Sequence, residues 1–176
     1  MVEKYRWLIT IIVLIALGGC SQYVEGTEIP FTRVAEFNEL VGSNPDHYQD
    51  EATMVLMISQ SDEKIQLEAL VPKHLKPTIH EVSPDRQIVI ALFQGEKRSS
   101  GYGVTITKIV YAGSDVYIYT RFDTPQRGQL QEGGTRSPVS IVSIERGALP
   151  ANEPLSVHLM GDATKQEVLV QEYTVK

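Results

Sequence analysis

The chain has 176 residues, of which 42% are hydrophobic, and a formal net charge of −6. This length suits one domain with a sizeable core, and the acidic balance disfavours nucleic acid as a partner. The single cysteine excludes an internal disulfide and any metal site built on paired thiols.

The first twenty residues have the pattern of an export signal. Lys4 and Arg6 precede an uncharged apolar run over 7–17, which is too short for a settled helix across a ~30 Å hydrocarbon core. The sequence Leu17-Gly-Gly-Cys20 follows and resembles the lipobox of bacterial lipoproteins, in which the cysteine becomes lipid-modified. We therefore predict a signal peptide over 1–19 and lipidation of Cys20. The expected location is the bacterial cell envelope: the outer membrane in a diderm host, and otherwise the outer face of the cytoplasmic membrane.

A polar tether and a short helix are expected next. Residues 20–32 lack periodicity and are predicted to form a flexible tether before one β-rich domain over 33–176. Hydrophobic residues then recur at helical spacing at Val34, Phe37, Leu40 and Val41. This spacing predicts one short helix near the start of the domain.

The sequence contains two weak candidates for metal ligands. Asp46, His47, Asp50 and Glu51 cluster in a polar segment, but no further ligand group lies at a recognised spacing. The histidines at 74 and 80 are six residues apart, which fits no common zinc pair. We predict no metal and no cofactor.

Most of the remaining chain has the pattern of strands. Short apolar or alternating runs are separated by turn residues, and the run over 88–93 is apolar at every position, as in a strand covered on both faces. We predict a mostly β fold, an antiparallel β-sandwich or partly open barrel of about seven to nine strands with one short N-terminal helix. The expected strands are 53–58 paired with 65–71, then 88–93, 104–111 paired with 116–122, 139–145, and 155–160 paired with 167–175.

A tyrosine between two glycines begins the clearest hairpin. Gly101 and Gly103 permit either positive φ or the close approach of another chain beside Tyr102. We therefore treat both as structural glycines that position the ring.

This stretch also carries a family resemblance. The segments Phe93-Gln-Gly95, Ser100-Gly-Tyr-Gly103, Pro125 and Ser137-Pro-Val-Ser-Ile-Val-Ser-Ile144 resemble the PrcB C-terminal domain, over a core of about 86–146. The family is named for a lipoprotein subunit of a secreted protease complex. Residues 126–136 depart from the family pattern.

Aromatic and basic residues near this hairpin are the candidate binding surface. Tyr117, Tyr119 and Arg121 share one face of a predicted strand, and a long polar connection follows over 123–138. Tyrosine and arginine are enriched at interface hot spots. The alternative is that the two tyrosines pack under a loop or a second sheet. The predicted partner-binding residues are Tyr102, Tyr117, Tyr119, Arg121, Arg127 and Arg136.

The sequence lacks recognised catalytic motifs. It contains no GxSxG elbow, no HExxH and no phosphate-binding loop, so we predict no catalytic residues and no enzyme. The expected function is a lipid-anchored accessory that binds another envelope or secreted protein, and the resemblance implies a protease as the partner. The alternatives are a small-ligand binding module and, third, an uncharacterised hydrolase.

Overall fold

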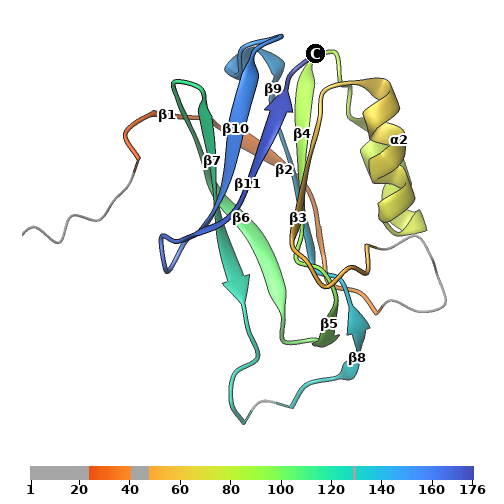
Figure 1. The fold of residues 1–176 in the computed structure, drawn as a ribbon. Helices are drawn as coiled ribbons and strands as arrows, with labels where there is room; N and C mark the ends of the chain where they lie inside the picture. Colours follow the sequence, from red (N-terminus) through yellow and green to blue (C-terminus); the bar gives the residue numbers. More distant parts are fainter. Residues whose placement is uncertain (1–23, 41–47, 129) are drawn as a thin grey trace, which may run out of the picture.

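A computed structural model describes residues 24–40, 48–128 and 130–176. These ranges contain eleven strands and two α-helices. Nine of the strands form two packed sheets, with the helices on the outside of one of them, and the other two form a separate ribbon (Figure 1). Strands account for 49% and helices for 15% of the residues, and the sheets do not close into a barrel. The prediction of a mostly β fold is confirmed.

The first sheet has five strands in the order β1-β6-β7-β10-β11. The predicted hairpins at 104–122 and 155–175 are confirmed as β6–β7 and β10–β11, both antiparallel. The two hairpins meet through a parallel pairing of β7 with β10. The bounds are β1 Thr27–Glu28, β6 Gly103–Ala112, β7 Asp115–Asp123, β10 Pro154–Gly161 and β11 Glu167–Thr174.

The second sheet has four strands in the order β2-β9-β4-β3, all antiparallel neighbours. Its two interior strands are buried at nearly every position because both of their faces are covered. This confirms the predicted central strand at 88–93. The bounds are β2 Phe31–Phe37, β9 Val139–Glu145, β4 Gln87–Phe93 and β3 Met54–Ile58.

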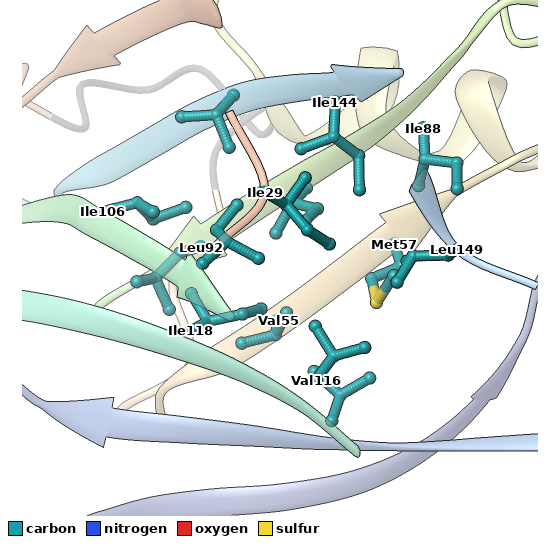
Figure 2. Packing of buried hydrophobic residues seen from close by; sticks show 14 of the residues in the cluster. Ile29, Val55, Met57, Ile88, Leu92, Ile106, Val116, Ile118, Ile144 and Leu149 are labelled. Carbon is teal, nitrogen blue, oxygen red and sulfur yellow. The ribbon is translucent and has the colours of Figure 1, made fainter. Parts of the chain in front are cut away.

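Two hydrophobic cores hold these layers together. The first lies between the sheets, where Ile118 of one sheet and Leu92 of the other point into the same space (Figure 2). The second lies on the other face of the four-stranded sheet, beneath α2 (Ser61–Leu70) and α3 (Lys76–Glu81). Short 3-10 turns at Lys73–Leu75 and Arg146–Ala148 complete the described elements.

The predicted strand over 65–71 is wrong, because this segment forms α2. The run Ser61-Asp-Glu-Lys64 is the first helical turn and not a hairpin loop. Gln60 and Glu63 form a capping box, with the Gln60 N–H donating to Glu63 Oε2 at 3.1 Å. Leu67 is completely buried against the sheet, whereas Ile65 is 66% exposed.

The predicted helix over 34–41 is also wrong, because residues 31–37 form β2. A bulge between Arg33 and Ala35 reverses the alternation of side chains along this strand. Phe31 therefore packs on the first core, and Phe37 packs on the second. This reversal produces apolar spacing that imitates a helix. Leu40 lies beyond β2, and Val41 lies outside the described residues.

The predicted tether over 20–32 is too long at its C-terminal end. β1 pairs with β6, and Ile29 is 3% exposed within the first core (Figure 2). The Ile29 N–H also donates to Ile109 O at 2.9 Å. The signal peptide and Cys20 lie outside the described residues. Within the described residues, no helix has the length and apolar character needed to cross a bilayer.

Candidate functional site

A two-stranded ribbon projects from one end of the two packed sheets. It consists of β5 (Lys97–Ser99) and β8 (Gly133–Arg136), which pair antiparallel and lie beyond the ends of β6 and β9 in Figure 1. The long polar connection that was expected over 123–138 therefore ends in a strand, β8. We call the projecting segments 97–102, 124–128 and 130–136 the ribbon end.

Hydrogen bonds from Asn38 attach this ribbon end to the sandwich. The Asn38 Nδ2 donates to Ser100 O at 3.1 Å and to Tyr102 O at 2.5 Å. The backbone carbonyl oxygen of Asn38 accepts from Arg136 Nη1 at 2.8 Å. Across the ribbon, Ser100 N–H donates to Glu132 O at 3.0 Å, and Glu132 N–H donates to Ser100 Oγ at 3.1 Å. These bonds fix the base of the ribbon in one orientation.

The two predicted structural glycines act through close approach and not through positive φ. A Cβ at Gly101 would lie 2.6 Å from the Gln131 side chain, and one at Gly103 would lie 3.1 Å from Asp123 Oδ2. Tyr102 between them is partly buried, with Lys97 Nζ 6.0 Å from the centroid of its ring. The close-approach interpretation is therefore the correct one of the two.

The three predicted arginines differ in how accessible they are. Arg127 is exposed in the turn of the ribbon end, and Arg121 forms a solvent-exposed ion pair with Asp123 at 3.2 Å. Arg136, in contrast, is only 7% exposed and binds Asn38 O and the Glu132 carboxylate. Its guanidinium holds β8 against the segment that follows β2, so Arg136 has a structural role in this conformation, and its contact with a partner stays a prediction.

The two strand tyrosines are remote from the ribbon end. In the β6–β7 register, Tyr117 pairs with Val110, whereas Asp123 pairs with Gly103 at the opposite end of the hairpin. Six residues of strand separate these pairs, a span of about 20 Å. Tyr119 is 1% exposed, beneath Lys165 Nζ at 5.4 Å from its ring centroid. The packing alternative is therefore correct for Tyr119, and the single surface joining Tyr102 to both strand tyrosines does not form.

Tyr117 instead belongs to a charged cluster on the open face of the five-stranded sheet. Its ring stacks on His158 with centroids 4.7 Å apart and planes 14° apart. The His158 ring nitrogens lie 3.0 Å from Asp115 Oδ1 and 2.7 Å from Glu167 Oε2. The sequence does not reveal this cluster, because the parallel pairing of β7 with β10 places Tyr117 beside His158.

This cluster predicts a pH-dependent stability. Burial lowers the pKa of His158, but hydrogen bonds and charge from Glu167 and Asp115 outweigh burial and raise it. A raised pKa in the folded state means that the native protein binds more protons than the unfolded chain. The contribution of His158 to the free energy of unfolding should therefore be fully present below about pH 6.5. It should be lost as the pH rises through the raised pKa of the folded state.

Urea unfolding at pH 6 and at pH 9 measures this dependence. The free energy of unfolding should fall between the two pH values by a smaller amount in His158→Gln than in the wild type. His74→Gln is the matched control, because the exposed His74 also contacts a carboxylate, Glu39, at 3.1 Å. Equal pH dependence in the wild type and His158→Gln would contradict the prediction.

Within the described residues, no group of three histidine, cysteine or carboxylate side chains is arranged to hold a metal ion. His80 lies 3.5 Å from the Glu68 carboxylate, and His74 contacts Glu39 as described above. Asp46 and His47 of the weak metal candidate lie outside the described residues.

Comparison with known proteins finds one similarity, in the middle of the chain. Residues 88–145 match the PrcB C-terminal family, which confirms the resemblance predicted from the sequence. The matched segment runs from β4 through β9 and so includes the whole ribbon end. No curated protein and no solved structure matched the chain.

Proposed function

Because residues 88–145 match the PrcB C-terminal family, we propose that this protein is a lipid-anchored accessory of the bacterial cell envelope that binds another protein. The lipobox-like sequence ending at Cys20 supports the anchor. The partner is another envelope or secreted protein, and the resemblance favours a protease. In this proposal the protein performs no catalysis of its own.

The observation that carries the proposal is the composition of the ribbon end. Leu130 is fully exposed there, and Arg98 and Arg127 are also exposed. Arginine is enriched at interface hot spots, and the exposed Leu130 side chain gives a partner an apolar group to bury. The chain as a whole has a net charge of −6, so a basic end favours a partner with an acidic surface around an apolar depression.

The position of the ribbon end relative to the proposed anchor also supports this function. β1 pairs with Val110 and Tyr111, close to the turn that joins β6 and β7. The ribbon end lies beyond the opposite ends of these strands (Figure 1). A chain attached to a membrane through Cys20 can therefore present the ribbon end away from its attachment point.

Photo-crosslinking in cells that express the full chain tests this proposal. A photoreactive residue at position 98 or 130 should give a discrete adduct with one partner, and the same residue at Ser114, in the turn at the opposite end, should not. Arg98→Glu/Arg127→Glu should reduce the adduct by about 10-fold, with an unchanged melting temperature. Cys20→Ala should leave the protein unprocessed or release it from the membrane fraction.

Two outcomes contradict the proposal. Equal labelling from positions 114, 98 and 130 would show that the ribbon end is not the contact surface. Uptake of labelled fatty acid by Cys20→Ala would show that the lipid is attached elsewhere.

A further inference from the structure

The last strand of the five-stranded sheet has an unpaired edge. β11 pairs with β10 on one side, and within the described residues no strand pairs with its other side. It is eight residues long and contains no proline and no basic residue. Unpaired backbone N–H and C=O groups on a long edge strand accept a strand from another chain unless charge, proline or a covering segment blocks them.

The other three edges of the two packed sheets are less open. β1 has only two residues, and β2 is interrupted by the bulge at Arg33. β3 has five residues, and its Val55 carbonyl oxygen already accepts from Gln171 Nε2 at 3.0 Å. β11 is therefore the edge with the most room for an added strand.

A groove runs beside this edge. Two adjacent hollows, of about 240 and 320 Å³, share Glu63 of α2 and Tyr173 of β11 as lining residues. The first continues along β3, and the second continues past Glu172 towards Lys176. β11 is joined to β3 by the bond from Gln171 Nε2 to Val55 O, and the hollows beside this bond leave space in which side chains of an added strand can lie.

The floor of the groove holds a carboxylate in a fixed position. Glu63 Oε2 accepts from Ser59 N at 2.7 Å and from Tyr173 Oη at 3.2 Å. Burial is the main cause that raises the pKa of Tyr173 to about 12, so its hydroxyl stays protonated and donates at neutral pH. Glu172 lines the second hollow. Its carboxylate, however, lies on the outer face of the sheet, where it accepts from Ser156 Oγ of β10 at 2.9 Å. Acidic groups therefore lie on both sides of this end of β11, which favours basic side chains in an added strand.

The outer face of β11 has a different character. Val168 and Val170 are 47% and 44% exposed. They alternate with Leu169 and Gln171, whose side chains lie towards the groove side of the strand. An added strand would therefore meet Glu63 on the groove side, and the two valines together with the Glu172 carboxylate on the outer face.

We propose that an extended segment of the partner protein pairs with the free edge of β11, with basic side chains entering the groove at Glu63 and apolar side chains beside Val168 and Val170. This inference rests on the proposed function for the existence of a protein partner. It assigns a second contact surface, distinct from the ribbon end.

A random-peptide library tests the edge directly. Detergent-solubilised full-length protein should enrich peptides in which lysine or arginine alternates with valine, isoleucine or threonine. N-methylation of alternate backbone nitrogens in an enriched peptide should weaken binding by about 10-fold or more, because edge pairing needs those N–H groups. The double variant Val170→Lys/Glu172→Lys should weaken binding to a similar degree.

Ile65→Lys is the matched control for the protein. Ile65 is an exposed apolar residue on α2 that does not line either hollow. This variant should bind the enriched peptide as the wild type does. Enrichment of acidic or proline-rich peptides, no enrichment over the double variant, or insensitivity to N-methylation would overturn the inference. These outcomes would contradict the contact at β11 without affecting the crosslinking result at the ribbon end. Each proposal can therefore be contradicted independently of the other.

Discussion

Gly95→Ala is expected to lower the free energy of unfolding by about 3 kcal/mol or more. Gly95 has φ of +79°, and a Cβ there would lie 2.5 Å from Ala52 O and 2.8 Å from Glu51 O, with Asp50 O also in contact. These are backbone atoms, which do not move aside as a flexible side chain does. The neighbouring Glu96 N–H donates to Asp50 O at 2.7 Å, so the two segments have to remain close.

Gly113→Ala separates the two causes of this effect. Gly113 also has a positive φ, of +69°, but a Cβ there would meet nothing within 4 Å. Its substitution should cost only the conformational penalty of about 1 kcal/mol. Equilibrium urea unfolding of both variants gives the comparison. Equal costs would show that the close approach at Gly95 contributes nothing.

Leu67→Ala is expected to lower the free energy of unfolding by about 3 kcal/mol, because it leaves a cavity in the second core. Leu67 is completely buried between α2 and the four-stranded sheet. Ile65→Ala is the matched control and should change stability by no more than about 0.5 kcal/mol, since Ile65 is 66% exposed. Chemical denaturation measures both.

The pair Leu67 and Ile65 also distinguishes a helix from a strand. In a strand these residues, two positions apart, point to the same face and would both be buried or both be exposed. In a helix they point in directions about 200° apart. A large loss of stability in both variants would therefore contradict α2 and restore the strand predicted from alternation.

The part of the fold that could be predicted from sequence is the part where one pattern allows one structure. The run 88–93 is apolar at every position, short and rich in β-branched residues, which together favour a strand covered on both faces over a buried helix. The segment 65–71 was ambiguous, because Ile65, Leu67, Ala69 and Val71 alternate while Leu67 and Val71 are also one helical turn apart. Glu63 decides for the helix through its capping bond to Gln60, a contact that alternation does not reveal.

The candidate site was predictable only in part for a similar reason. Residue type identified Tyr102 and Arg127, which do lie at the ribbon end, but it did not distinguish an exposed arginine from the buried Arg136. Arg136 is buried because Asn38, almost a hundred residues earlier, offers its carbonyl oxygen at 2.8 Å. Such pairings depend on tertiary packing. The exposure of Leu130 likewise follows from how far the ribbon projects.

The parallel pairing of β7 with β10 means that the family-matched segment lacks one of the strands that complete its sheet. Residues 88–145 end before β10, so a fragment with these boundaries leaves β7 as a bare edge. Val116 and Ile118 would lose Val157 and Leu159 from the same core. During synthesis the same surface stays open until the last quarter of the chain has emerged. Until β10 has been synthesised, the unpaired edge of β7 can therefore pair with strands of other chains.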